Sequence, residues 1–269
     1  MRLLPATIEV ARQSLAGLSR HRMLWLLGLG LGAMAILLGI LAGLGELPRS
    51  FHAARTCVLV GTLFHVYALL PWTAMFFAVQ AVHGDIEDRT FQYLFVRPVP
   101  RAALFLGKWA ASFATSFSVL AVGTAMLPLA VAGLEWPESL GPLGFLREYE
   151  KALLFGAAAY SSMAALMAAR FRRPMIWSAA YIVGLEYIAA SLPPEAGVRG
   201  LAVVDALRRM LIDGLDARGR MLRMLWPNSP WRYDFVGRPE KQLLWMTLGC
   251  LLVGAIIYAR SEYDSRSRE

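Results

Sequence analysis

The chain is poor in charged residues and in cysteine. Charged residues make up 17% of its 269 residues, against about 25% in ordinary globular proteins. Apolar residues reach 57%, above the roughly 45–50% of soluble domains. The two cysteines, Cys57 and Cys250, lack metal-ligand spacing, and Cys250 falls inside an apolar run. This composition excludes a disulfide framework and an ordinary soluble domain, and it is typical of a polytopic membrane protein.

Motifs for nucleotide hydrolysis and other catalysis are also missing. No Gly-x-x-x-x-Gly-Lys-Ser/Thr loop occurs, because Gly107-Lys108 is followed by Trp109. Ser161 and Ser162 have no histidine in a usable register, and His83 with Glu87 would supply only two metal ligands. No basic tract with interleaved aromatic residues points to nucleic acid. We therefore expect no catalytic residues, no metal site, no cofactor in this chain and no nucleic-acid partner.

Six apolar runs approach the roughly 20 residues that a helix needs to cross a bilayer. They cover about residues 24–44, 58–82, 103–134, 152–169, 175–192 and 243–259. Pro71 predicts a kink in the second run, and Pro128 an interruption in the third. The third run is expected to extend into the cytoplasm at its start, where Lys108 lies. The expected fold is an all-α polytopic membrane protein with six transmembrane helices, forming one domain over residues 1–269.

Residues 6–20 have a helical pattern of apolar and polar positions. Ile8, Ala11, Leu15 and Leu18 are expected on one face, and Glu9, Arg12, Gln13 and Arg20 on the other. This pattern predicts a helix that lies in the membrane interface, although a solvated extension of the first span would also fit. The segment is polar and the first apolar run is long, so no cleavable signal peptide is expected.

Lysine and arginine favour one set of short loops, which sets the orientation. The rich set holds Arg2, Arg12, Arg20, Arg22, Arg89, Arg97, Arg101, Lys108, Arg170, Arg172, Arg173, Arg260, Arg266 and Arg268, whereas the opposite loops hold only Arg49, Arg55, Arg147 and Lys151. The rich set is therefore expected in the cytoplasm, together with both termini. A multi-pass protein of a bacterial-type plasma (inner) membrane follows.

Residues 193–242 are expected outside, although they contain nine basic residues. Such a long loop weakens the positive-inside rule. Residues 201–212 have a helical pattern, residues 218–226 resemble a second amphipathic piece, and Trp226, Trp231 and Tyr233 suit a membrane interface. Met210, Met221 and Met224 suit amphipathic packing better than soft-metal binding. This external helical loop is either a cap, a docking surface for an external partner, or a linker without its own function.

Residues 83–108 form a charged island between two apolar runs. Asp85, Glu87 and Asp88 suit the start of a helix. The apolar face of that helix would comprise Ile86, Thr90, Phe91, Leu94 and Phe95. Pro98 and Pro100 would end it. The pattern predicts a short amphipathic helix that either transmits a push from a soluble partner or rests on the lipid.

Three groups of residues in this island carry a resemblance to a known family. They are Glu87-Asp88-Arg89-Thr90-Phe91 with Leu94, then Arg97-Pro98-Val99-Pro100-Arg101, then Leu106-Gly107-Lys108. The set resembles the cytoplasmic signature of ABC-2 type transporter permeases. Arg89 stands where that family usually has glycine, and Pro100 where serine is common. The loss of the glycine puts the start of the helix in doubt.

The resemblance implies a six-span half-transporter that pairs with a second permease copy, a homodimer or heterodimer. Two cytoplasmic ABC ATPase subunits would bind ATP and Mg and contact a coupling helix. The coupling residues would be Asp85, Ile86, Glu87, Asp88, Arg89, Thr90, Phe91, Leu94, Phe95, Arg97 and Arg101. The N-terminal helix would be the interfacial connecting helix, in contact with membrane lipids.

Glu186 is the acidic residue inside an expected span. An intramembrane carboxylate is costly and usually faces protein or water, so Glu186 is a candidate pathway residue, or a hydrogen-bonding residue between helices. His65 and Gln80 are weaker candidates of the same kind. Two functions fit this sequence: an exporter permease for a lipid-like or amphipathic substrate, or a scaffold that passes ATPase-driven motion to an external partner at residues 193–242.

Overall fold

The computed structural model describes residues 3–44, 53–87, 99–132, 136, 141–188, 202–215 and 238–260. Every element within these ranges is helical. The elements are α1 (Leu3–Ser19), α2 (Arg22–Gly43), α3 (Ala53–Val60), the π-helix η1 (Gly61–Leu69), α4 (Leu70–Glu87), α6 (Arg101–Ala130), α7 (Pro142–Arg170), α8 (Pro174–Tyr181), the π-helix η2 (Ile182–Ile188), α9 (Val203–Leu215) and α11 (Pro239–Arg260). The all-helical expectation is confirmed for this part of the chain.

Five of the described helices are long and apolar enough to cross a membrane. They are Arg22–Gly43, Arg55–Gly84, Arg101–Ala130, Pro142–Arg170 and Pro239–Arg260. At about 1.5 Å per residue, even the shorter ones reach about 33 Å, which exceeds a hydrocarbon core of about 30 Å. The expected fifth span corresponds to α8 and η2, with eight and seven described residues. A multi-pass membrane protein is therefore supported, and the number six stays a prediction.

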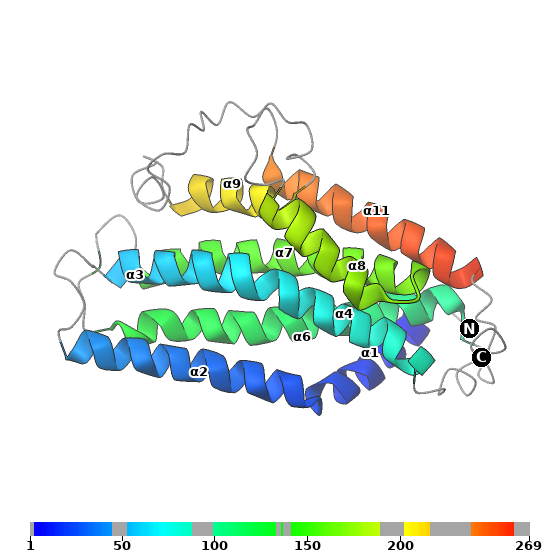
Figure 1. The fold of residues 1–269 in the computed structure, drawn as a ribbon, viewed down its shortest axis with the longest axis horizontal. Helices are drawn as coiled ribbons and strands as arrows, with labels where there is room; N and C mark the ends of the chain where they lie inside the picture. Colours follow the sequence, from blue (N-terminus) through cyan, green and yellow to red (C-terminus); the bar gives the residue numbers. More distant parts are fainter. Residues whose placement is uncertain are drawn as a thin grey trace.

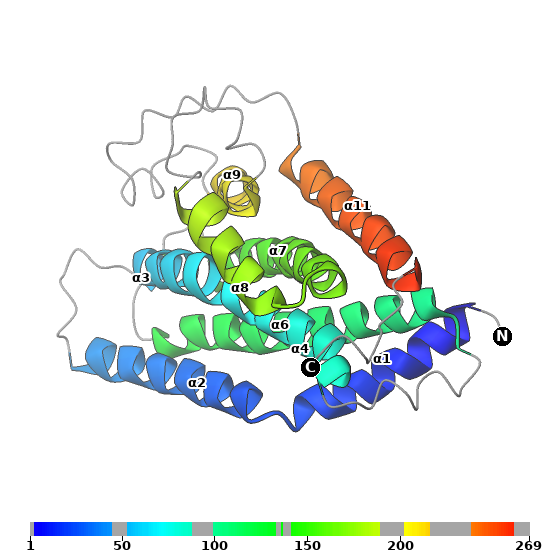
Figure 2. The same cartoon turned by 45° about the vertical axis from the view of Figure 1, so that its right-hand side comes forward.

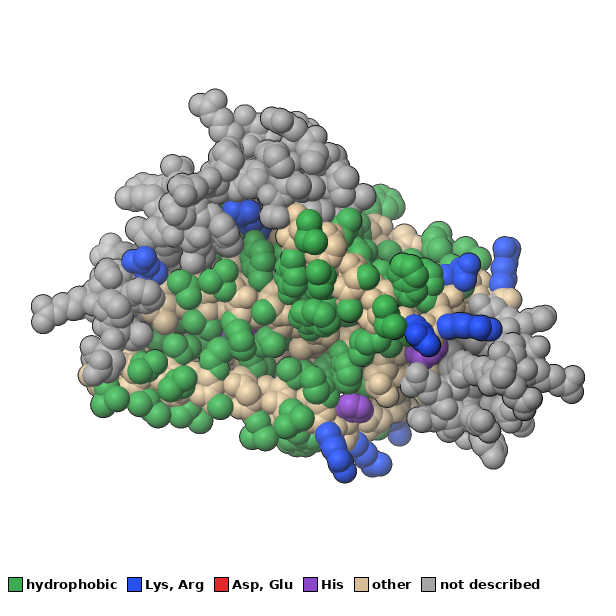
Figure 3. Space-filling model, viewed as in Figure 1, with side chains coloured by type: hydrophobic (Ala, Val, Ile, Leu, Met, Phe, Trp, Pro, Cys, Tyr) green, Lys and Arg blue, Asp and Glu red, His purple; other side chains and the backbone are tan. Residues whose placement is uncertain are grey.

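The long helices form a bundle with α6 and α7 in the middle. Figures 1 and 2 show α2 and α11 on opposite flanks, with α4 between α6 and α8. The beginning of α1, the beginning of α6 and the end of α11 lie at one end of the bundle (Figure 1). Arginine and lysine side chains gather toward that end, and apolar side chains cover the middle of the visible face (Figure 3). This distribution matches a membrane-embedded middle and a basic end.

The second span changes helix type before Pro71. Residues 61–69 form a π-helix, in which the Leu70 N–H donates to the His65 carbonyl. Because proline has no N–H, the Tyr67 carbonyl loses the partner that an α-helix would give it. The Tyr187 hydroxyl of η2 donates to that carbonyl over 3.1 Å. The expected irregularity is present, and it occupies the two turns before the proline.

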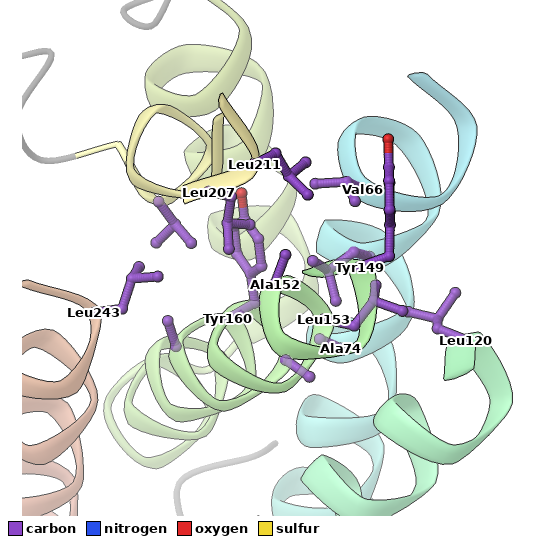
Figure 4. Close-up of a cluster of buried hydrophobic side chains, with 14 of the residues drawn as sticks. Val66, Ala74, Leu120, Tyr149, Ala152, Leu153, Tyr160, Leu207, Leu211 and Leu243 are labelled. Atoms are coloured by element: carbon purple, nitrogen blue, oxygen red, sulfur yellow. The ribbon is translucent and has the colours of Figure 1, made fainter. Parts of the chain in front are cut away.

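The largest buried cluster joins α4, α6, α7, α9 and α11 (Figure 4). Small residues of α7 permit this close packing. A Cβ atom added at Gly156 would lie 2.6 Å from Leu70 Cδ2 and 2.9 Å from Leu207 Cδ1. Two turns before Gly156 in α7, the Tyr149 hydroxyl donates to the Val58 carbonyl over 3.0 Å and also contacts the Thr62 hydroxyl. The core therefore combines apolar contacts with a few fully buried hydrogen bonds.

Helix α1 leaves the axis of α2 at His21 and lies against α6. The His21 imidazole accepts a hydrogen bond from the Met23 N–H at the start of α2. A Cβ atom added at Gly107 of α6 would meet Thr7 O at 2.8 Å, so the two backbones lie close together. Leu18 is buried, whereas Ile8 is 65% exposed. The predicted apolar face is therefore divided between a contact with the bundle and an exposed side that suits a membrane interface.

Candidate functional site: the predicted coupling loop and the Glu186 cluster

The structure describes both ends of the predicted coupling segment. Asp85, Ile86 and Glu87 belong to the last turn of α4, which continues five residues beyond the expected end of the second span at Val82. These residues therefore end the long helix, where the sequence pattern predicted a new helix start. Arg101 is the first residue of α6. The other predicted coupling residues lie outside the described residues: Asp88, Arg89, Thr90, Phe91, Leu94, Phe95 and Arg97.

The start of α6 is tied to the end of α11. The Arg101 Nη1 group donates to the Ala259 carbonyl over 3.2 Å. The Pro100 carbonyl accepts the first hydrogen bond of α6, from the Ala103 N–H, at 2.9 Å. The helix thus begins directly after the proline pair, as the sequence predicts. The first turn of α6, which follows the predicted coupling loop in the chain, therefore also contacts α11.

Close to the described ends of this loop, at Glu87 and Arg101, four helices share a small buried cluster. Val82 of α4, Phe105 of α6, Ala168 of α7 and Tyr258 of α11 all belong to it. The ring centroids of Phe105 and Tyr258 lie 5.7 Å apart. A Cβ atom added at Gly254 of α11 would lie 2.5 Å from Phe105 Cζ. Because packed interiors transmit strain, a displacement of the loop would reach four helices at once.

Lys108 lies near the start of α6, where the third span is predicted to extend into the cytoplasm, and that extension stays a prediction. Lys108 is only 2% exposed. It lies one residue after Gly107, where α6 contacts α1. The basic residue is therefore buried within the bundle.

Glu186 lies at the centre of a buried hydrogen-bond cluster and is 1% exposed. Its Oε2 accepts hydrogen bonds from the Tyr160 hydroxyl and the Val204 N–H, both at 2.8 Å. Its Oε1 accepts from the Tyr181 hydroxyl at 2.5 Å and the Val203 N–H at 2.9 Å. Four donors therefore surround a carboxylate that has about four lone-pair positions. These four bonds offset part of the desolvation cost of a buried carboxylate.

Helix α9 has two further polar contacts along its length. The Arg209 Nη2 group donates to Gln242 Oε1 of α11 at 2.7 Å, and its Nε lies 3.2 Å from Asp205 Oδ2. Near the end of α9, Gly214 lies directly against the Glu148 side chain of α7. The helix predicted at residues 201–212 exists at Val203–Leu215. It packs beside α7 and α11, with its first residues fully buried.

The position of α9 along the axis of α7 follows from the contacts between the two helices. A rise of about 1.5 Å per residue puts Tyr160 roughly 15 Å along α7 from Arg170. Glu186 accepts hydrogen bonds from both Tyr160 and the first N–H groups of α9, so the N-terminus of α9 lies at the level of Tyr160. Gly214, near the C-terminus of α9, lies against Glu148, toward the start of α7. Helix α9 therefore runs alongside α7 from the level of Tyr160 to that of Glu148, and the external position of residues 193–242 stays a prediction.

Sequence reasoning found Glu186 but missed its partners. Tyr181 and Glu186 are five residues apart, a spacing that brings side chains together in the π-helical turn of η2. Tyr160 comes from another helix and has no local signal. His65 is fully buried, and neither ring nitrogen has a hydrogen bond of acceptable geometry. Within the described residues, no group of three His, Cys, Asp or Glu side chains lies close enough to hold a metal.

Comparison with known proteins supports the family assignment. A family model described as ABC-2 family transporter protein matches residues 16–188, about two thirds of the chain. No curated protein matches the chain. The matched region runs from the end of α1 through η2 and includes both described ends of the predicted coupling loop. The chain belongs to the ABC-2 transporter family, as a multi-pass transmembrane permease subunit of an ABC transporter.

Proposed function

We propose that this chain is the permease subunit of an exporter-type ABC transporter. A separate ATPase subunit would hydrolyse ATP and press on residues 85–101. The resulting motion would move a lipid-like or amphipathic substrate outward. Membership of the family, whose members generally work with an ATPase and as dimers, supports this function. The observation that carries it is the four-helix cluster close to the described ends of the loop.

The coupling mechanism rests on how this cluster is packed. Val82 and Phe105 come from the two helices that flank the loop, and both are fully buried. Arg101 adds a hydrogen bond from the first residue of α6 to the last turn of α11. An ATPase that displaces the loop would therefore move α4, α6 and α11 together. Asp85–Phe95 would form the contact, with Arg97 and Arg101 at its exit.

The proposed orientation puts both termini and this loop in the cytoplasm, in a six-span protein of a bacterial-type inner membrane. The basic end of the bundle supports it (Figure 3). That end carries Arg20, Arg22, Arg101, Arg170 and Arg260, as the positive-inside rule expects. In this orientation α1 lies at the cytoplasmic interface.

A second copy and membrane lipids would cover the exposed apolar helices. On α2, Leu29 is 69% exposed, and on α11, Trp245 is 72% exposed. Such surfaces are stable in lipid or against another transmembrane helix. The second permease copy, identical or not, would complete the transporter at one of them.

A force-transmitting scaffold is the second candidate, because α9 is firmly attached to the bundle. Glu186, Arg209 and Glu148 connect α9 to three neighbouring elements. A motion of these helices would therefore be carried into residues 193–242, where an external partner would receive it. This candidate predicts a stable external partner, whereas the exporter predicts a substrate.

The exchange of Phe91 and Leu94 for aspartate tests the coupling assignment. Two charges on the apolar face should detach the ATPase or abolish its stimulation, while the permease stays inserted. Leu143→Asp is the matched control, since Leu143 is 81% exposed at the start of α7, at the other end of the bundle. Normal co-purification and normal stimulated hydrolysis in the double variant would overturn the assignment.

A further inference from the structure

The Glu186 carboxylate connects four helical elements. Glu186 belongs to η2 and accepts hydrogen bonds from the hydroxyl groups of Tyr160 in α7 and Tyr181 in α8. It also accepts hydrogen bonds from the backbone N–H groups of Val203 and Val204 in α9. Each carboxylate oxygen accepts one hydrogen bond from a tyrosine hydroxyl and one from a backbone N–H group. The arrangement leaves no oxygen position open toward a ligand.

The N-terminus of α9 requires such an acceptor. The first N–H groups of a helix have no partner within the helix, and they carry a partial positive charge. Val203 and Val204 are buried by surrounding side chains, so water is not at hand to satisfy them. An uncompensated polar group in such a place is costly. A carboxylate satisfies both N–H groups and complements the helix dipole.

We propose that Glu186 is a positioning residue that fixes the N-terminus of α9 to α7 and α8, so that α9 moves with these helices. The contact of Leu207 with Gly156 and the hydrogen bond from Arg209 to Gln242 hold the rest of α9. Loss of the carboxylate should therefore release the first turns of α9 and leave the bundle intact. The proposal does not depend on the ATPase partner.

The test measures how easily water reaches α9. In a background with Cys57→Ala and Cys250→Ala, Ala206→Cys adds a thiol at a fully buried position of α9. The intact chain, in membrane vesicles, is treated with a water-soluble maleimide. Glu186→Gln keeps the size but has one acceptor oxygen, so an amide N–H₂ would face a backbone donor. Labelling at position 206 should become about tenfold faster, equivalent to about 1.4 kcal/mol of lost anchoring.

Two controls separate local release from other effects. Tyr187→Phe removes a hydroxyl from the neighbouring position of η2 that bonds to the Tyr67 carbonyl, and it should leave labelling at position 206 unchanged. Ala164→Cys places a thiol in the buried part of α7, and it should stay unlabelled in every variant. If Glu186→Gln exposes both reporters, Glu186→Asp decides: it keeps the charge but shortens the side chain by one methylene, which draws the carboxylate away from the Val203 and Val204 N–H groups, and it should expose position 206 alone.

Unchanged labelling at position 206 in Glu186→Gln would overturn the proposal. Unchanged labelling together with altered transport would assign Glu186 to a pathway instead. Labelling at both reporters in Glu186→Asp would also overturn it, since the cluster would then support the whole bundle. The labelling readouts do not require ATPase binding, so a failure of the proposed function would be seen separately.

Discussion

Helix α11 offers a direct test of its packing against Phe105 of α6 in the four-helix cluster, because two glycines of α11 differ in their surroundings. A Cβ atom at Gly254 would lie 2.5 Å from Phe105 Cζ and 3.1 Å from Phe105 Cε1, whereas a Cβ atom at Gly249 would meet nothing within 4 Å. Both Gly→Ala changes remove the same backbone penalty of up to about 1 kcal/mol. Gly254→Ala adds an overpacking cost of typically about 1–3 kcal/mol. The difference between the two variants therefore isolates the contact with Phe105.

Thermal unfolding of the purified protein in one detergent would measure this difference. A change of 1 kcal/mol shifts Tm by about 2–4 °C for a chain of about 150–250 residues. Gly254→Ala should therefore unfold several degrees below Gly249→Ala, and the latter should match or slightly exceed the parent. ATPase stimulation should fall in the Gly254 variant only. Equal Tm values for the two variants would refute the close contact between α11 and α6.

The remaining predictions concern a buried and an exposed polar contact. Tyr149→Phe leaves the Thr62 hydroxyl and the Val58 carbonyl without this partner; we expect a loss of about 1–3 kcal/mol, seen as a lower Tm, and an unchanged Tm would contradict the buried bond. Lys151→Met removes a 2.8 Å ion pair with Glu240 whose side chains are 42% and 30% exposed. Such pairs contribute about 0–1 kcal/mol, so a large drop in Tm would show that this pair is more protected than its exposure indicates.

Composition predicted the helices well but their ends less well. Apolar runs mark the part of a helix inside the membrane, and the helix itself continues into polar sequence. The fourth span was expected from Ala152, whereas α7 begins at Pro142, because Arg147, Glu148 and Lys151 extend the helix beyond the apolar run. Likewise α4 continues to Glu87. Hydropathy alone does not register these extensions, since lysine and glutamate are good helix formers.

Long-range partners were beyond the reach of single-sequence reasoning. Glu186 stood out because a carboxylate inside an apolar run is costly. Its partner Tyr160 lies 26 residues away in the chain, and the N-terminus of α9 became a partner only through folding. Likewise Tyr187, which donates to the Tyr67 carbonyl of the π-helix at residues 61–69, comes from a separate helix. The coupling residues Asp88 to Arg97 stay a prediction, since they lie outside the described residues.

Affinity purification of the intact chain from its native membrane tests the central claim most directly. The proteins recovered with it would be identified, and ATP hydrolysis by the complex would be measured. The account predicts a soluble ABC-type ATPase in a fixed ratio to the permease, with hydrolysis lowered when Phe91 and Leu94 are both exchanged for aspartate. Recovery of the chain at good yield without any ATPase would contradict it.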